Sequence, residues 1–360
     1  MAHYDSIRAS FELKLQDEFK RLIDSYTDKI EDLFSIYNFL FNVGDDSSQA
    51  DIPTKQLVFD EIKINSSNGL EKSPHTTSSL VESMWYSISG GKRFRALILY
   101  IISYSLLNSD NYKFKQLKNN NISLVDRFAI AIEFIQAYSL VHDDLPAFDN
   151  DDFRRGKFST HAKYGETTAI LCGDALLNYA TEVLLKEDEA IDSYSDYMRA
   201  CHYLLNQSGI SGMISGQDKD ILLEREFSKL AEIDELVLME LKKTACLLSA
   251  SFVCPFILFA LPEYYISEIK KIAYMFGLAF QIQDDILDNE ANKGKLGKSI
   301  GKDAKVGKKT FYTVLGAEKA KALCNELFEN INRCIDSLKD EGLNLQELRI
   351  FIDSVREREY

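Results

Sequence analysis

The sequence has few residues that interrupt helices. It contains 5 prolines and 17 glycines among 360 residues, too few turn-forming residues for a protein built of many short strands. Leu, Ile, Lys, Glu and Ala are abundant, and no stretch has the alternation typical of a strand. With 46% hydrophobic residues the chain can bury a sizeable core, so the composition predicts a helical globular protein.

The sequence also lacks an excess of positive charge. It has 42 Lys and Arg against 56 Asp and Glu, which gives a formal net charge of -14. Proteins that bind nucleic acid or anionic membranes usually present a basic surface. We therefore expect neither to be the main partner.

No long apolar run is present. The most apolar stretches, 96–107 and 247–261, are shorter than the roughly 20 residues that span a bilayer, so we predict buried core helices and no membrane span. The first residues carry acids and no apolar run, which predicts neither a secretory signal nor a transit peptide. We expect a cytoplasmic protein.

The six cysteines form no C-x-x-C pair. They lie in apolar stretches, which favours buried free thiols in a reducing compartment over disulfides or a zinc site. They are Cys172, Cys201, Cys246, Cys254, Cys324 and Cys334.

Apolar residues spaced three and four apart predict most of the chain to be helical. Residues 1–41 read as a helix or a helix pair and 42–79 as a polar surface insertion; 80–360 forms one catalytic domain together with 1–41. Gly90-Gly91 is predicted to end the helix that begins at residue 80. Further helices are predicted at 94–108, 123–143, 165–186, 194–222, 230–260, 264–290, 311–338 and 343–358.

The first of two acidic clusters is "LVHDDLPAFDNDDFRRGK", residues 140–157. Asp143 and Asp149 are six residues apart and would point to nearly opposite sides of a straight helix. Pro146 cannot continue the helix beyond Leu145. We therefore predict a turn that brings Asp149 back alongside Asp143.

The second cluster, "FQIQDDILD" at residues 280–288, lies inside a helical pattern. Gln281, Asp284 and Asp288 share one face, and like charges at this spacing repel. A cation is needed to offset them. Carboxylates without Cys or His suit Mg²⁺, which also binds substrate phosphates.

Other interpretations of the first cluster are less favoured. A charge run can be a solvated loop. A calcium-binding EF-hand loop needs Gly at its sixth position, where this chain has Arg154. A metal phosphohydrolase built on His142 is unlikely with only five histidines, none of them clustered. Two carboxylate clusters on apolar helices favour magnesium and a diphosphate.

A diphosphate site needs Lys and Arg in addition to magnesium. Such groups accompany both acidic clusters and the "GGKRFR" stretch: Lys92, Arg95, Arg154, Arg155, Lys243, Lys298 and Lys308. Gln136 lies two helical turns before Asp143 on the same face. Gly212 and Gly216 permit close helix packing, and Gln217 and Asp220 are candidates for orienting metal-bound water.

Six motifs, in order, resemble the trans-isoprenyl diphosphate synthase family, specifically its bacterial-type farnesyl diphosphate synthases. They are "GGKRFR", "HDDLPAFDNDDFRRGK", "GISGMISGQDKD", "KT" at 243–244, "FQIQDDILD" and "LGKSIGKDAKVGKKTF", over roughly residues 80 to 338. The resemblance implies an all-α bundle around a central cavity, usually a homodimer. It also implies two aspartate motifs that hold three Mg²⁺ ions and face each other across the cavity.

The resemblance also implies residue roles. Asp143, Asp149 and Asp284 would bind magnesium; Asp144 would support them or join the metal set, and Asp288 would support them. The allylic diphosphate would be held by Arg154, Lys243, Gln281, Lys298 and Lys308, and isopentenyl diphosphate by Lys92, Arg95, Gln136 and Arg155. Lys243, Gln281, Asp284, Asp288 and Lys298 would be the catalytic set. The chain departs from many relatives at Trp85, Ala96 and Gln136, and in the insertion at 42–79.

Product length in this family depends on the residues four and five before the first aspartate, here Ser139 and Tyr138. A large Tyr138 favours the C15 product, farnesyl diphosphate. Geranylgeranyl diphosphate synthase is the alternative. A terpene cyclase needs no isopentenyl diphosphate site, and non-catalytic subunits of this fold typically lose an aspartate motif or a key lysine, so both are less favoured.

Overall fold

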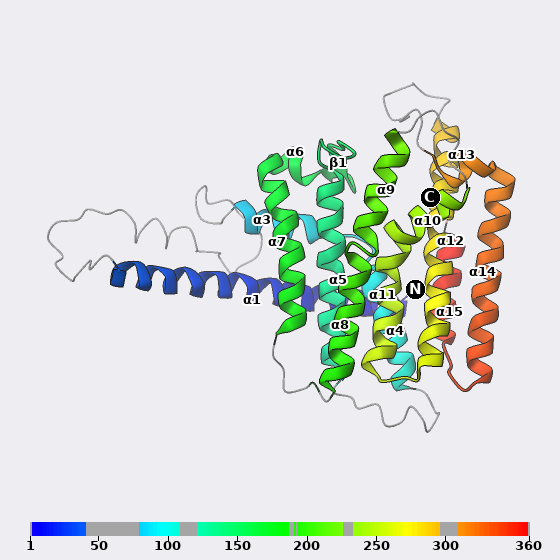
Figure 1. Ribbon diagram of the computed structural model, residues 1–360, viewed down its shortest axis with the longest axis horizontal. Helices are drawn as coiled ribbons and strands as arrows, with labels where there is room; N and C mark the ends of the chain where they lie inside the picture. The colour runs from blue at the N-terminus through cyan, green and yellow to red at the C-terminus, as the bar shows by residue number, and fades with distance from the viewer. Residues whose placement is uncertain are drawn as a thin grey trace. The chain divides into compact units, whose positions relative to one another are not determined.

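Helices make up nearly all of the computed structural model, which describes residues 2–40, 79–108, 121–186, 191, 193–225, 233–295 and 309–358 (Figure 1). The helices are α1 (Ala2–Leu40), α3 (Ser79–Ile88), α4 (Phe94–Leu107), α5 (Asn121–Asp143), α6 (Thr160–Tyr164), α7 (Glu166–Leu185), α8 (Tyr194–Ser208), α9 (Met213–Arg225), α10 (Ile233–Glu240), the π-helix η1 (Leu241–Ala245), α11 (Cys246–Leu258), α12 (Glu263–Lys295), α13 (Phe311–Leu315), α14 (Ala317–Asp340) and α15 (Gln346–Arg356). The predicted all-α class is confirmed.

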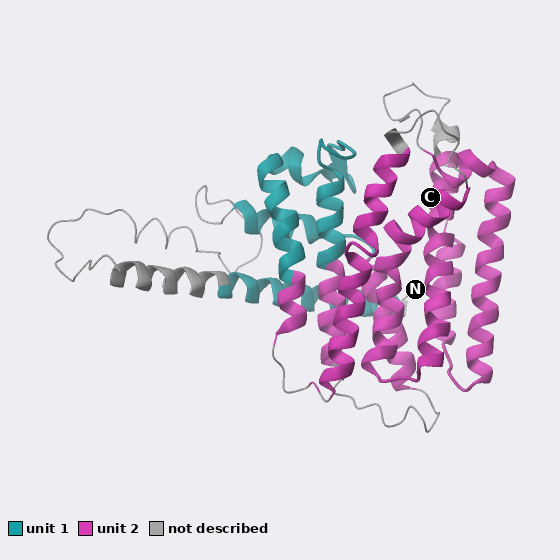
Figure 2. Cartoon of the chain, in the orientation of Figure 1, with its two compact units in different colours: residues 1–92, 134–179 teal, residues 93–133, 180–360 magenta. Residues whose placement is uncertain are grey.

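The chain divides into two compact units (Figure 2). Unit 1 comprises residues 1–92 and 134–179, and unit 2 comprises residues 93–133 and 180–360. Helices α5 and α7 contribute residues to both units. The predicted grouping of 1–41 with 80–360 into one domain therefore stays a prediction. The predicted insertion, 42–79, lies outside the described residues apart from Ser79.

In unit 1, α1 is a single helix rather than a pair. Its predicted apolar face is buried through Phe11, Leu15, Phe19 and Leu22, and the ring of Phe19 lies 5.0 Å from that of Trp85 on α3. Helix α3 ends at Ile88, just before the predicted stop.

Gly90 and Gly91 have φ angles of 86° and 101°, a left-handed conformation that glycine adopts at little cost. The predicted helix end is confirmed.

In unit 2, α11 is the central helix, and every one of its residues is buried. It packs against α4, α8 and α12. All-round burial explains why its sequence is continuously apolar and shows no amphipathic period.

Three predicted helices are interrupted in the structure, two of them at glycines. The predicted helix at 194–222 breaks between α8 and α9, where Gly212 donates its N–H to the Gly209 carbonyl at 3.0 Å. The helix at 311–338 breaks at Gly316, whose φ is 79°. The helix at 230–260 changes to π geometry in η1.

The prediction of no strand is wrong at one place. β1 (Phe153–Arg154) and β2 (Lys157–Phe158) form a two-residue antiparallel hairpin, with Phe153 opposite Phe158. Their length explains the miss, because two residues cannot show a period of two.

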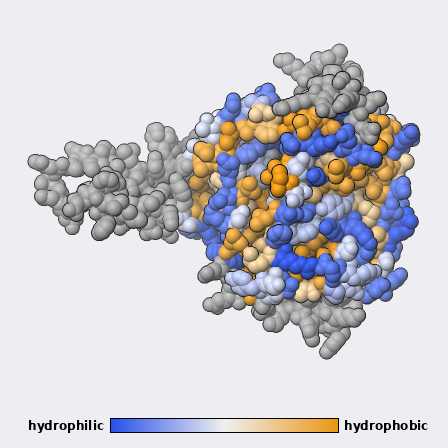
Figure 3. Space-filling view, viewed as in Figure 1, coloured by the Kyte–Doolittle hydropathy of each residue, from blue (hydrophilic) through white to orange (hydrophobic). Residues whose placement is uncertain are grey.

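All six cysteines fall within the described residues and are free thiols, five of them buried. The predicted burial is confirmed for those five, and Cys334 is half-buried. Two helical stretches, Glu166–Leu185 and Ile233–Leu258, have the length and composition to cross a membrane, and 78% of the apolar window in the second is buried inside the protein, as in many core helices. On the face in Figure 3 apolar residues are interspersed with hydrophilic ones.

Candidate active site

The chain folds back on itself directly after α5. Asp149 donates its backbone N–H to the carbonyl of Asp143 at 2.9 Å, and Asp151 donates to the carbonyl of Asp144 at 3.2 Å. Asp143 and Asp149 are both half-buried. The turn predicted at Pro146 is therefore confirmed, and it places the two residues side by side.

Asp144 has a different environment from Asp143. Its side chain is 2% exposed, and the Arg154 guanidinium donates to it from Nε at 2.7 and 2.8 Å and from Nη2 at 2.6 Å. Burial raises the pKa of Asp144, although the ion pair with Arg154 acts in the opposite direction. Both carboxylate oxygens contact Arg154, so this geometry favours holding the arginine over binding metal.

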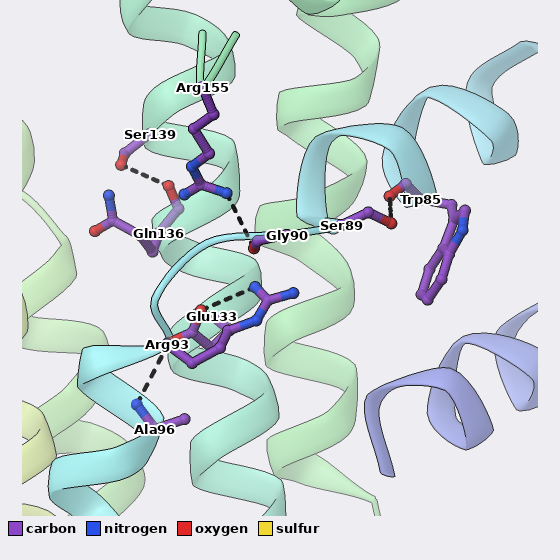
Figure 4. A network of polar contacts seen from close by, with 9 residues as sticks. All are labelled: Trp85, Ser89, Gly90, Arg93, Ala96, Glu133, Gln136, Ser139 and Arg155. Atoms are coloured by element: carbon purple, nitrogen blue, oxygen red, sulfur yellow. Dashed lines mark hydrogen bonds and ion pairs between the residues drawn. The ribbon is translucent and has the colours of Figure 1, made fainter. Parts of the chain in front are cut away.

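The hairpin after the first cluster positions the second arginine. Arg155 and Gly156, its two central residues, have φ angles of 52° and 72°, as in a type I′ turn. Arg155 donates from Nη1 to the Gly90 carbonyl at 3.1 Å (Figure 4). A Cβ on Gly91 would lie 2.8 Å from the same nitrogen, so the glycine allows the guanidinium to lie against the turn.

A cleft of about 170 Å³ lies within unit 1, against these arginines. Its lining combines cationic and hydroxyl side chains: Arg154, Arg155, Lys157, Ser87, Ser89 and Thr160. Such groups donate hydrogen bonds and carry positive charge, the chemistry that binds a phosphate group. Gln136, on α5, is half-buried.

The two arginines of the loop "GGKRFR" differ in burial. Arg93 has a φ of 55°, is 5% exposed and donates from Nη1 to Glu133 at 3.1 Å (Figure 4). Lys92 is exposed and Arg95 is half-buried. Sequence reasoning missed the Arg93–Glu133 pair, for which the signal was a lone acid in the apolar stretch "AIAIEFIQA".

In unit 2, Lys243 lies at the middle of η1. A π segment inserts an extra residue into a helical turn and is frequent at functional sites. The Lys243 ammonium lies 2.5 Å from Oδ2 of Asp220, which is buried on α9. A Cβ on Gly216 would lie only 2.1 Å from the backbone nitrogen of Lys243, so the close packing predicted at Gly216 is confirmed.

Asp220 therefore orients Lys243 directly. Its predicted role toward metal-bound water stays a prediction, as does that of the half-buried Gln217.

The second acidic cluster lies within the uninterrupted helix α12. Asp284 forms an ion pair with Arg358, a residue that sequence reasoning missed. Asp285 is buried and accepts from the Phe311 N–H at 2.9 Å and from the Gln281 amide at 3.2 Å. Asp288 is exposed. The leading aspartate is thus half-buried and the next one is held by the protein.

The remaining predicted residues are placed as follows. Tyr138 is 6% exposed and packs edge to face on His142, with ring centroids 5.8 Å apart; burial raises its pKa to about 12. Ser139 is half-buried and donates to the Gln136 carbonyl at 2.9 Å. Lys298 and Lys308 lie outside the described residues.

The acidic residues fit magnesium in a particular way. In the part of the chain that the structure describes, no three His, Cys, Asp or Glu side chains converge as a metal cage. Magnesium is usually held by one or two carboxylates together with waters and substrate phosphates. The half-buried Asp143, Asp149 and Asp284 provide such single oxygen donors.

Comparison with known proteins identifies similar sequences over most of the chain. Residues 77–342 match the family described as Polyprenyl synthetase. Farnesyl diphosphate synthase of Escherichia coli (strain K12) is 35% identical over 292 residues, covering 79% of this chain and 91% of the relative. Geranylgeranyl pyrophosphate synthase 3, chloroplastic, of Arabidopsis thaliana is 35% identical over 247 residues, covering 68% and 65%.

Solved structures are similar as well. The crystal structure of a geranyltransferase from Helicobacter pylori, complexed with magnesium and isoprenyl diphosphate, matches with a TM-score of 0.64 and 29% identity. The match covers 82% of this chain and 92% of that structure. By its sequence, its fold and its two aspartate motifs, the chain belongs to the polyprenyl synthetase family.

Proposed function

We propose that this protein is a short-chain trans-prenyltransferase that condenses isopentenyl diphosphate with dimethylallyl and geranyl diphosphate to give farnesyl diphosphate. The observation that carries the proposal is in unit 1, where Asp144, Arg154 and Arg155 line the cleft and the adjoining turn brings the half-buried Asp143 and Asp149 together. Carboxylates for magnesium and guanidinium groups for phosphate are the two components that a diphosphate requires.

Asp143, Asp149 and Asp284 are proposed to bind magnesium, three ions in all, with Asp288 in support. Asp144 serves the site by holding Arg154. The allylic diphosphate is assigned to four cationic side chains and one amide: Arg154, Lys243, Gln281, Lys298 and Lys308. Isopentenyl diphosphate is assigned to Lys92, Arg95, Gln136 and Arg155.

The chemistry proceeds by cleavage of the allylic C–O bond, whose electron pair leaves with pyrophosphate. When bound, magnesium neutralises the charge that grows on that leaving group. Arg154 and Lys243 are each held by a buried aspartate, so each can donate hydrogen bonds to a diphosphate oxygen without reorganising, which lowers the barrier. The double bond of isopentenyl diphosphate then attacks the allylic carbon, and the resulting cation loses a proton to pyrophosphate.

Purified protein incubated with labelled isopentenyl diphosphate and each allylic diphosphate tests the proposal. We expect magnesium-dependent formation of C15 diphosphate and loss of turnover when the metal is chelated. Release of pyrophosphate from an allylic diphosphate alone, with a hydrocarbon product, would instead identify a terpene cyclase.

Geranylgeranyl diphosphate synthase is a second candidate, because a relative of that name has the same 35% identity, although over 247 residues rather than 292. A C20 product in the same assay would establish it. We also propose a cytoplasmic homodimer, which fractionation and light scattering would test.

A further inference from the structure

Glu240 is a buried carboxyl group with no part in the roles assigned above. It is the last residue of α10, is 8% exposed, and directly precedes the π-helix that carries Lys243. A buried carboxylate carries a large desolvation penalty. Its presence beside the proposed allylic site therefore calls for a physical reason.

A chain of hydrogen bonds runs from Glu240 to α13. Thr244 lies 2.9 Å from Glu240 Oε2 and 3.4 Å from Gln281 Oε1, both measured from its hydroxyl oxygen. The Gln281 amide nitrogen donates to Asp285 at 3.2 Å, and the Phe311 N–H donates to the other Asp285 oxygen at 2.9 Å.

The Asp285 end of this chain fixes the orientation of Gln281. The NH₂ group of Gln281 faces Asp285, to which it donates. The amide oxygen of Gln281 then faces Thr244. Two oxygens thus lie 3.4 Å apart, with one hydroxyl proton available to the pair.

When Glu240 is ionised, the Thr244 hydroxyl donates its hydrogen bond to Glu240. The contact to Glu240 is the shorter of the two, and a hydrogen bond to a charged acceptor is roughly twice as strong as one between neutral groups. The Thr244 hydroxyl oxygen and the Gln281 amide oxygen are then both acceptors with no proton between them.

We propose that Glu240 is a positioning residue that draws the Thr244 hydroxyl proton away from Gln281, so that both oxygens present their lone pairs to the positive charge developing on the allylic group. The inference deepens the proposed function and rests on it, because the allylic substrate is assigned to Lys243 and Gln281.

The charge state of Glu240 controls this arrangement. Its pKa is raised to about 7: burial is the largest cause, the hydrogen bond from Thr244 and the charge of Lys243 on η1 lower it, and Asp285 on α12 and Asp220 on α9 act in the same direction as burial. Helix α13 carries Tyr312 as its titratable residue. Neutral Glu240 donates to Thr244, which must then donate to Gln281, and the acceptor pair is lost. Turnover should therefore fall as the pH drops through about 7.

The first test compares Glu240→Gln with Glu235→Gln, an exposed glutamate on the same helix. We expect kcat to fall about tenfold in Glu240→Gln, the size of one hydrogen bond of about 1.4 kcal/mol, with both KM values unchanged. The acid limb of the kcat profile should disappear. Glu235→Gln should match the wild type in all three respects. Unchanged kcat and pH profile in Glu240→Gln would overturn the inference.

Thr244 provides a second variant pair. Thr244→Ser keeps the hydroxyl and should keep the acid limb of the kcat profile, whereas Thr244→Val should abolish it. An acid limb that persists in Thr244→Val would show that Glu240 does not act through this hydroxyl.

Stability gives a readout that does not depend on turnover. The pKa of Glu240 is higher in the folded protein than in the unfolded chain. Its contribution to stability is therefore fully present when the pH is below the pKa of the unfolded chain, and it is lost as the pH rises through about 7. Glu240→Gln should therefore melt higher than the wild type at pH 8, with the gain shrinking toward pH 5. A double-mutant cycle with Thr244→Val at pH 8 should show coupling.

The two failures are distinguishable. A wild-type protein that forms no prenyl product refutes the proposed function. A cycle without coupling refutes the role of Glu240, whether or not the protein is active.

Discussion

The two aspartate motifs share one pattern of burial but differ in the groups that hold the buried aspartate. In each, the first aspartate of the pair is half-buried and the second is buried: Asp143 with Asp144, and Asp284 with Asp285. Asp144 is held by the Arg154 guanidinium at the end of a helix. Asp285 is held by the Phe311 N–H and the Gln281 amide inside a continuous helix.

The difference teaches how a chain can present two carboxylates together. Asp284 and Asp288 are four residues apart, so the helix alone places them on one face. Asp143 and Asp149 are six residues apart and depend on a turn, which is closed by the hydrogen bond from the Asp149 backbone N–H to the Asp143 carbonyl. The second motif therefore depends on a regular element and the first on a loop that must be held.

The largest expected effect comes from removing a leading aspartate of either motif. Asp143→Ala and Asp284→Ala should each lower turnover by roughly 10³-fold, because a lost ligand weakens charge neutralisation at the leaving group by about 4 kcal/mol. Circular dichroism should show an intact fold. Asp152→Asn, exposed in the first loop, serves as the control. Near-normal turnover in Asp143→Ala would reject the metal assignment.

The next effect compares the buried aspartates. Asp144→Asn should destabilise by about 3 kcal/mol, because it leaves the part-buried Arg154 without its ionised partner. Asp285→Asn should lower the free energy of unfolding by about 1.5 kcal/mol, the lower end of the range for a hydrogen bond to a charged acceptor. Denaturant unfolding of both variants measures the difference. The opposite order would show that the loop is less dependent on its ion pair than its geometry suggests.

Sequence periodicity predicted most of the fold, because helices are local. The turn at Pro146 and the end of α3 at Gly90-Gly91 both follow from backbone restrictions on one or two residues. The hairpin and η1 were missed because they are short. Two-residue strands and a five-residue π segment leave no periodic pattern in the sequence.

Site residues were predictable where their chemistry is unusual for their position. The two acidic clusters stand out because like charges are rarely concentrated on apolar helices. Arg358 and Glu240 could not be found in this way. Arg358 pairs with Asp284, which is distant in the sequence, and the contact of Glu240 with Thr244 depends on the π geometry of η1. A lone arginine near a terminus and a lone glutamate in a helix have no distinctive pattern.

A smaller effect concerns product length and applies to one motif only. Tyr138 lies five residues before Asp143, whereas the residue five before Asp284 is the small Ala279. Tyr138→Ala should lengthen the product beyond C15 with turnover largely retained, because it removes a buried ring next to the first motif. Chromatography of the prenyl alcohols measures it, with the exposed Tyr194→Ala as control. An unchanged C15 product would place the limit on another helix.

The smallest effect distinguishes the leading aspartates of the two motifs. Asp284 forms an ion pair with Arg358 from the C-terminal end of the chain, and the Arg358 guanidinium also lies 4.4 Å from the Phe280 ring centroid. A partly exposed ion pair is worth about 0.2–1 kcal/mol. Because a cation at Asp284 must compete with this arginine, Arg358→Met should tighten magnesium binding by up to about fivefold in the absence of substrate. Calorimetry measures the affinity, and Arg356→Met, which removes the neighbouring pair with Glu329, is the matched control. Weaker binding in Arg358→Met would show that the arginine orients Asp284 for the metal and does not compete with it.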